Sequence, residues 1–171
     1  MKVIRAQKNS TDCIICGMEN QLGVKAPFFE MEDGSVATVF SYRKEHQSYP
    51  ERTHGGMITA LLDELMGRTL WVKEPNGYGV TTTLSVTFRK PVPYGVKLKA
   101  RAYMTFNSPR GFSAKGELYS IDGVLLAEAT CKYLKLPSTV TFGSQEQADS
   151  AMKYDAPIVL SEIDFPPIPE K

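Results

Sequence analysis

The sequence of 171 residues contains no long apolar run and no strong excess of either charge. No segment approaches the roughly 18 consecutive apolar residues that a membrane-spanning helix needs, so we expect no membrane insertion. The first ten residues also lack the apolar stretch of a secretory signal, and a cytoplasmic location is the simplest expectation. The formal net charge is only +1, which disfavours nucleic acid or an anionic membrane as a partner.

Cysteine is scarce as well, with only Cys13, Cys16 and Cys131. An odd number in a chain without an export signal indicates reduced thiols. Cys13 and Cys16 have the spacing of half a zinc site, but the remaining sulfur and imidazole ligands, Cys131, His46 and His54, lie far away in the sequence. We therefore expect no metal site. A redox pair is also disfavoured, because no strand precedes and no helix follows the motif.

The chain length suits one domain with a hydrophobic core. We expect this domain to span residues 1–136, with residues 1–33 irregular because turn formers are frequent there. Residues 137–171 are rich in Ser, Pro and acidic residues. They predict a C-terminal extension that is packed on the surface or partly disordered.

Residues 55–73 predict the one long helix of the chain. Its apolar residues recur close to helical spacing, and the Pro75-Asn76-Gly77 turn stops it. A helix that is apolar over most of its surface must be largely buried. These apolar positions are Ile58, Leu61, Leu62, Leu65, Met66 and Leu70.

Alternating apolar and polar residues predict strands before and after this helix. The pattern favours an α+β fold, in which one antiparallel sheet wraps around the helix and the four later strands form a meander. The alternation of Lys97, Lys99 and Arg101 indicates that the outer face of the sheet is in water. The predicted strands are residues 36–42, 80–88, 96–106, 112–121 and 124–136, the last two joined by the hairpin signal Asp122-Gly123.

Two glycines, Gly55 and Gly56, open the predicted helix directly after His54. The first backbone N–H groups of a helix have no intrahelical partner and lie at the positive end of its dipole. They can therefore bind an anion, or a carbonyl oxygen that becomes one during attack. Equally, the two glycines can serve only a turn or a close approach of backbones.

Two neighbouring carboxylates on the helix differ in their surroundings. Glu64 precedes Arg68 by four residues, the favourable orientation for a helical ion pair. Asp63 has no such partner, and it falls in a stripe of small residues that includes Gly67. An unpaired carboxylate on a mostly buried helix is costly, which a catalytic role would explain, although a solvent-exposed position for Asp63 remains open.

These residues resemble the signature of hotdog thioesterases of the phenylacetate-pathway type, which implies the hotdog fold. The resemblance extends over roughly residues 13–136. Its central part is His54-Gly55-Gly56 followed by Leu62-Asp63-Glu64, flanked by Cys13-Ile14-Ile15-Cys16-Gly17 with Asn20 and Gly23, by Gln47-Ser48-Tyr49-Pro50, and by residues 84–93.

The resemblance implies an active site shared across a dimer, whose two sheets join edge to edge; a tetramer remains open. In such enzymes the helix aspartate, here Asp63, is the general base or the nucleophile. The amide of the first glycine, Gly55, polarises the thioester carbonyl. His54 resembles the histidine that positions this segment or the substrate carbonyl, and Thr81 is the nearest match to a hydroxyl residue that orients water. No cofactor is implied.

Four further residues are candidates for substrate binding together with Gly56. Many relatives carry an asparagine six residues before the histidine of the motif; here that position is Ser48, and the neighbouring Gln47 can substitute. Arg89 and Lys90 can contact the phosphates of coenzyme A, although exposed basic residues at a strand end are commonly only solvated.

Three functions follow as hypotheses. The first is hydrolysis of an acyl-coenzyme A or acyl-carrier thioester. The second is binding of acyl-coenzyme A without hydrolysis, for which an acidic residue at position 63 has no use. The third is a hotdog hydratase or dehydratase, which the thioesterase-type spacing of His54 and Asp63 disfavours. Fold alone does not separate them.

Overall fold

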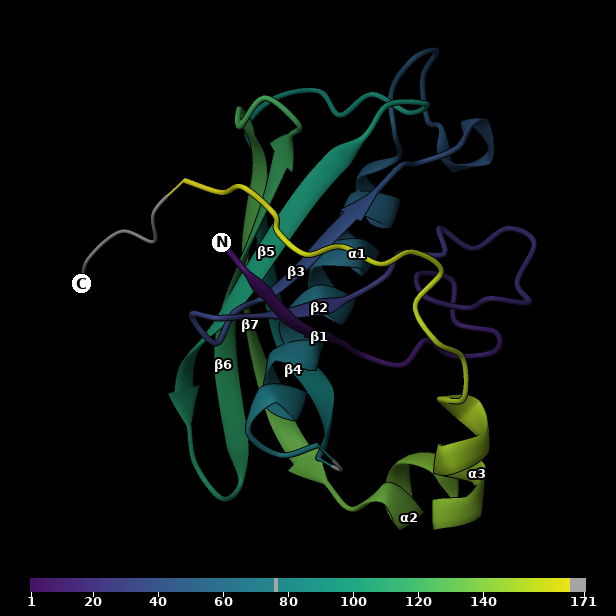
Figure 1. The fold of residues 1–171 in the computed structure, drawn as a ribbon, viewed down its shortest axis with the longest axis vertical. Helices are drawn as coiled ribbons and strands as arrows, with labels where there is room; N and C mark the ends of the chain where they lie inside the picture. Colours follow the sequence, from purple (N-terminus) through teal and green to yellow (C-terminus); the bar gives the residue numbers. More distant parts are fainter. Residues whose placement is uncertain (76, 167–171) are drawn as a thin grey trace.

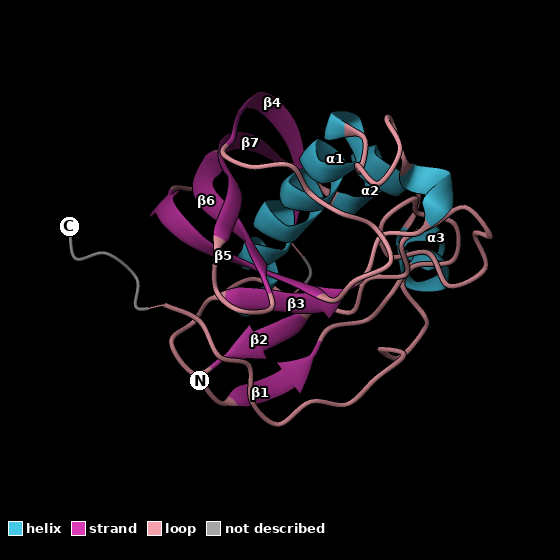
Figure 2. Cartoon of the chain, turned by 90° about the horizontal axis from the view of Figure 1, so that it is seen from above, coloured by secondary structure: helices cyan, strands magenta, loops and turns pink. Residues whose placement is uncertain are grey.

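The computed structural model describes residues 1–75 and 77–166. In this part of the chain, seven strands form one antiparallel sheet of order β1-β2-β3-β5-β6-β7-β4, which curls around helix α1 (Figures 1 and 2). The predicted α+β architecture is thereby confirmed. The elements are β1 (Val3–Ala6), β2 (Phe29–Met31), β3 (Val36–Phe40), the 3₁₀ turn η1 (Lys44–His46), α1 (Gly55–Gly67), the 3₁₀ turn η2 (Arg68–Val72), β4 (Tyr78–Phe88), β5 (Leu98–Asn107), β6 (Gly111–Ser120), β7 (Leu125–Leu136), α2 (Ser138–Phe142) and α3 (Gln145–Ala151).

The prediction that the four strands after the helix form a meander is wrong for one of them. Strands β5, β6 and β7 do follow one another as hairpins, but β4 pairs with β7 at the far edge of the sheet, and β5 pairs with β3. Alternation reports which face of a strand is buried and carries no information on its neighbours. As a result, no other strand in the described part of the chain pairs with the outer edge of β4.

The helix is shorter than predicted. Its α-helical part ends at Gly67, and the chain continues to Val72 as a 3₁₀ turn, a common way for a helix to tighten at its end. The predicted stop signal includes Asn76, which lies outside the described residues. None of the described helices has both the length and the apolarity that a membrane crossing requires.

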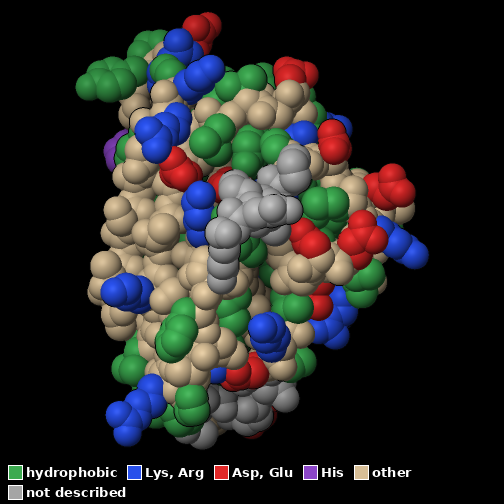
Figure 3. Space-filling view, turned by 90° about the vertical axis from the view of Figure 1, so that its left-hand side faces the viewer, with side chains coloured by type: hydrophobic (Ala, Val, Ile, Leu, Met, Phe, Trp, Pro, Cys, Tyr) green, Lys and Arg blue, Asp and Glu red, His purple; other side chains and the backbone are tan. Residues whose placement is uncertain are grey.

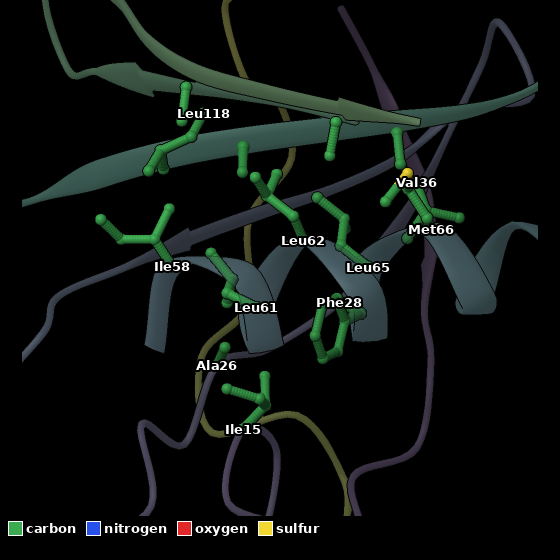
Figure 4. Packing of buried hydrophobic residues seen from close by; sticks show 14 of the residues in the cluster. Ile15, Ala26, Phe28, Val36, Ile58, Leu61, Leu62, Leu65, Met66 and Leu118 are labelled. Atoms are coloured by element: carbon green, nitrogen blue, oxygen red, sulfur yellow. The ribbon is translucent and has the colours of Figure 1, made fainter. Parts of the chain in front are cut away.

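Residues 1–33 were predicted to be irregular, yet they contribute strands β1 and β2, of which β1 is an edge of the sheet, and part of the core. Figure 4 shows Ile58, Leu62 and Leu65 pointing to the sheet, while Ile15 and Phe28 lie on the opposite side of the helix. The helix is therefore buried between the sheet and the N-terminal segment, which explains its nearly continuous apolar surface.

The prediction that the outer face of the sheet lies in water is wrong for Lys99 and Arg101, which are buried. The last described residues cross this face (Figure 1), and Phe165 packs over both side chains. Arg101 donates hydrogen bonds to Glu117 at 3.0 Å and to the carbonyl of Pro166 at 2.8 Å. Elsewhere on the face shown in Figure 3, charged side chains are interspersed with apolar ones.

Candidate active site

Asp63 lies one turn before the end of α1 and is half-buried. Its Oδ1 accepts hydrogen bonds from the Thr81 hydroxyl at 2.7 Å and from the Tyr133 hydroxyl at 3.2 Å. Tyr133 also donates to the Asp63 carbonyl at 2.8 Å. Within the described residues, the second carboxylate oxygen makes no hydrogen bond and Asp63 has no ion-pair partner. One oxygen is thus anchored while the other is available.

A bulge in β4 brings Thr81 to this site. The register of β4 on β7 shifts between Thr81 and Thr83, and Thr82 fills the gap by donating to the carbonyl of Lys132 at 3.0 Å. Strict alternation places Thr81 on the face opposite to Leu84, whereas the bulge allows both to face the helix. Thr81, proposed from the resemblance alone, therefore contacts Asp63 through a feature that alternation does not predict.

Two further neighbours of Asp63 come from β7, and the sequence pattern did not identify them as residues of this site. Tyr133 bonds the carboxylate, and the Cys131 sulfur lies 3.6 Å from Oδ1. Burial raises the pKa of Cys131 to about 11, and the Asp63 charge acts in the same direction, so this thiol stays protonated at neutral pH. Alternation does place both residues on one face of their strand, but only the register of β7 against α1 shows which helical residue they meet.

Asp63 opens into a cavity of about 710 Å³. One wall is formed by α1, the edge strand β4 and its neighbour β7, through Gly67, Tyr78 and Tyr133. The opposite wall comes from the C-terminal extension, where Phe142 packs edge-to-face on Tyr78 with ring centroids 4.8 Å apart. An acidic group thus lies in a largely apolar hollow, the usual character of a small-molecule site.

The start of α1 forms a second, separate feature. The His54 side chain caps the helix by accepting the Gly56 amide at 2.9 Å through Nδ1. Among the described residues, the Gly55 amide has no hydrogen-bond partner. It lies in a groove of about 420 Å³ that Arg89 and Lys90 also line. The capped helix start can therefore present one free N–H to a carbonyl oxygen.

The chain does not bring all its candidate residues together. Asp63 and Gly55 are eight residues apart on one helix, which is about 12 Å along its axis, and they line different hollows. Gln47 and Ser48 lie outside both hollows, in the turn before Thr53, where Gln47 accepts a long 3.4 Å bond from the Tyr94 hydroxyl. The chain thus holds the carboxylate and the free amide at the two ends of one helix.

A compact cluster adjoins Asp63 in the same cavity. The predicted ion pair of Glu64 with Arg68 is present, and Arg68 also donates to the Cys16 sulfur at 3.0 Å. Cys13 lies beside Cys16, whose hydrogen bond lowers the pKa of Cys13 to about 7, whereas the same bond and burial raise the pKa of Cys16. The Cys13 thiol is therefore the more acidic of the two.

One antiparallel sheet curled around a single long helix is the hotdog fold. The model of the thioesterase superfamily matches residues 52–127, the region from the helix start to β7. The resemblance to hotdog thioesterases predicted from the sequence is thereby confirmed. No curated protein matches the sequence at a significant level.

Solved structures support the same fold. A thioesterase superfamily protein is 23% identical, with a TM-score of 0.66 over 71% of this chain; the match covers only 62% of that protein's length. A Bacillus halodurans protein solved with coenzyme A is 26% identical over 65% of this chain and 74% of its own, with a TM-score of 0.58. A phenylacetic acid degradation-related protein of Ralstonia eutropha is 23% identical, over 65% and 85%, with a TM-score of 0.59.

Proposed function

We propose that the protein hydrolyses an acyl-coenzyme A thioester to the free acid and coenzyme A. The observation that carries the proposal is Asp63, a half-buried carboxylate with one anchored and one available oxygen in an apolar cavity. The thioesterase superfamily match spans this helix, and a similar protein was solved with coenzyme A. An acyl chain suits the apolar cavity, and a charged carrier suits the groove beside Lys90.

The chemistry requires a nucleophile and stabilisation of the oxyanion that forms on the thioester carbonyl. The available oxygen of Asp63 either takes a proton from the attacking water or attacks the carbonyl itself. Thr81 and Tyr133 hold the carboxylate in place from the other side. The free Gly55 amide supplies a donor for the oxyanion at the positive end of the helix dipole.

Because about 12 Å of helix separate Asp63 from Gly55, we propose that the two groups of one site come from different copies of the chain. Strand β4 begins at Tyr78, beside the Asp63 cavity, and ends at Phe88, beside the Gly55 groove. Antiparallel pairing of two free β4 edges about a twofold axis lays the start of one strand against the end of the other. The Gly55 amide of one copy then approaches Asp63 of the other, giving two equivalent sites per dimer.

Gly55→Pro tests the amide and the shared site together. Proline at the first helical position removes the N–H and preserves the helix, and His54, at φ −63° and ψ 133°, already has a conformation compatible with a following proline. We expect a loss of roughly 10²- to 10³-fold in kcat. Gly55→Ala, which keeps the N–H and whose Cβ would lie 3.4 Å from Phe88, is the matched control and should stay close to wild type.

Mixing inactive Gly55→Pro and Asp63→Asn proteins should restore activity after subunit exchange. Each mixed dimer contains one site with both lesions and one intact site, so random exchange is expected to restore about a quarter of the wild-type rate. Mass spectrometry of the mixture verifies exchange. If mixed dimers form and no activity returns, the shared site is refuted.

Lys90 is expected to contribute to substrate affinity rather than to chemistry. Arg89 is paired with Glu128, whereas Lys90 forms no ion pair within the described residues. Lys90→Gln should raise KM several-fold at low salt with little change in kcat, and the difference should shrink as salt screens the charge. Lys44→Gln, in an exposed turn outside the groove, is the control. An unchanged KM would exclude Lys90 from the binding site.

The decisive assay is release of free thiol from a panel of aliphatic and aromatic acyl-coenzyme A esters. Steady turnover of at least one ester supports a thioesterase. Tight binding of the esters without turnover would instead identify a binding protein, and hydration of an enoyl ester without thiol release would identify a hydratase.

A further inference from the structure

We propose that Cys13, Cys16 and Glu64 bind a thiophilic divalent cation such as Zn²⁺ at the wall of the Asp63 cavity. One ligand atom from each residue lies within 4.8 Å of the other two. The other sulfur and imidazole groups of the sequence, Cys131, His46 and His54, lie far from the Cys-x-x-Cys motif along the chain. The third ligand is instead a helical carboxylate that the sequence assigns to an ion pair. This proposal does not depend on which substrate the protein uses.

The spacing within the cluster fits tetrahedral coordination. The Cys16 sulfur and Glu64 Oε1 are 3.5 Å apart. With metal–sulfur and metal–oxygen bonds of about 2.3 and 2.0 Å, two ligands of a tetrahedral zinc ion lie about 3.5 Å from each other. Little movement of Cys16 or Glu64 is therefore needed to bind the ion.

The loop that carries the two cysteines is a tight turn that directs backbone amides toward sulfur. The Gly17 amide donates to the Cys13 carbonyl at 2.8 Å, and a Cβ on Gly17 would lie only 2.4 Å from that oxygen, so a side chain cannot be accommodated. The amides of Ile15 and Cys16 point at the Cys13 sulfur, at 3.3 and 3.5 Å. Backbone N–H groups directed at sulfur stabilise a metal-bound thiolate.

Arg68 orients two of the three ligands through hydrogen bonds from its guanidinium group. Its guanidinium donates to the Cys16 sulfur and to Glu64, both at 3.0 Å, and is itself held by the Lys8 carbonyl at 2.7 Å. Two thiolates and one carboxylate next to one guanidinium leave a formal charge of −2. A divalent cation neutralises this charge, which the partly buried cluster otherwise offsets by retaining protons on sulfur.

The cluster leaves a fourth coordination position on the cavity side. All three ligand residues line the cavity, and Asp63 adjoins Glu64 on the helix. Three protein ligands with one open position are the arrangement of catalytic zinc sites, whereas structural sites are closed by four ligands. We therefore expect a water molecule or a small thiol to complete the coordination.

Metal binding is tested on the reduced full-length protein. After incubation with Zn²⁺ and removal of free ion, elemental analysis should find one equivalent of zinc per chain. Titration with Co²⁺ should produce the intense thiolate-to-metal charge-transfer bands that report two sulfur ligands. Cys13→Ser and Glu64→Gln should weaken binding by more than the roughly 10- to 100-fold that loss of an outer-shell partner costs.

Cys131→Ser is the matched control, since it removes the one cysteine outside the cluster and should leave zinc affinity and the cobalt spectrum unchanged. If Cys13→Ser does not fold, Glu64→Gln and the wild-type cobalt spectrum decide. The proposal is overturned if the reduced wild type retains no zinc, if cobalt gives no charge-transfer band, or if Cys131→Ser weakens binding as much as Cys13→Ser. A Cys13–Cys16 disulfide that forms even in the presence of zinc would also overturn it.

Discussion

Turnover of acyl-coenzyme A is expected to fall about a hundredfold or more when Asp63 is replaced by Asn. Asparagine keeps the size of the side chain, and its carbonyl oxygen can still accept the hydrogen bonds from Thr81 and Tyr133. It has no negative charge with which to take a proton from water or attack a carbonyl. The measurement is the rate of thiol release under saturating substrate, alongside the melting temperature of each protein.

Asp122→Asn provides the control for the Asp63 substitution. Asp122 lies in the exposed turn between β6 and β7, outside both hollows, so its neutralisation should leave turnover unchanged. If Asp63→Asn turns over the ester as fast as wild type, the thioesterase assignment survives but Asp63 is not its catalytic carboxylate.

Replacing Arg101 by Ala is expected to destabilise the protein by about 3–5 kcal/mol. The Arg101 side chain is fully buried, and its partner Glu117 is only 5% exposed. Removal of the guanidinium leaves the buried carboxylate with only its longer ion pair to Lys115 at 3.3 Å, and also removes the hydrogen bond to the carbonyl of Pro166. Urea unfolding measures the loss directly.

Two comparisons separate burial of the charge from simple loss of an ion pair. Lys8→Ala breaks the exposed pair with Asp155 and should cost less than about 1 kcal/mol. The double variant Arg101→Met with Glu117→Leu removes both charges and should recover most of the lost stability. If Arg101→Ala lowers the free energy of unfolding no more than Lys8→Ala does, the C-terminal segment does not exclude water from this face of the sheet.

The same pair predicts a stability that depends on pH. Burial by itself raises the pKa of Glu117, but the hydrogen bonds from Arg101 and Tyr119 outweigh burial and hold the pKa below its ordinary value of 4.5. Because the folded-state pKa is the lower one, the pair stabilises the fold above pH 4.5, and this stabilisation is lost as the pH falls through the folded-state pKa. The doubly substituted protein should lack that part of the acid dependence.

The sequence by itself determined the central helix and five of the strands, and it named the candidate groups of the proposed site. The helical spacing of Ile58, Leu61 and Leu65 required a buried helix, because an apolar stripe must be removed from water wherever it lies. Alternation located five strands for the same reason. The His54-Gly55-Gly56 start and the position of Asp63 on the helix are local features, so the candidate catalytic groups could be named without coordinates.

Only the tertiary structure decided which of these parts meet. Hydrophobic periodicity assigns residues to a face and not to a neighbour, so it could not place β4 beside β7 or detect the bulge that turns Thr81 toward Asp63. Burial of Lys99 and Arg101 likewise depends on a segment about 60 residues later in the chain, which covers an otherwise exposed face. The meeting of Cys13, Cys16 and Glu64 is of the same kind, because contacts between distant residues arise from packing of the whole chain rather than from any local pattern.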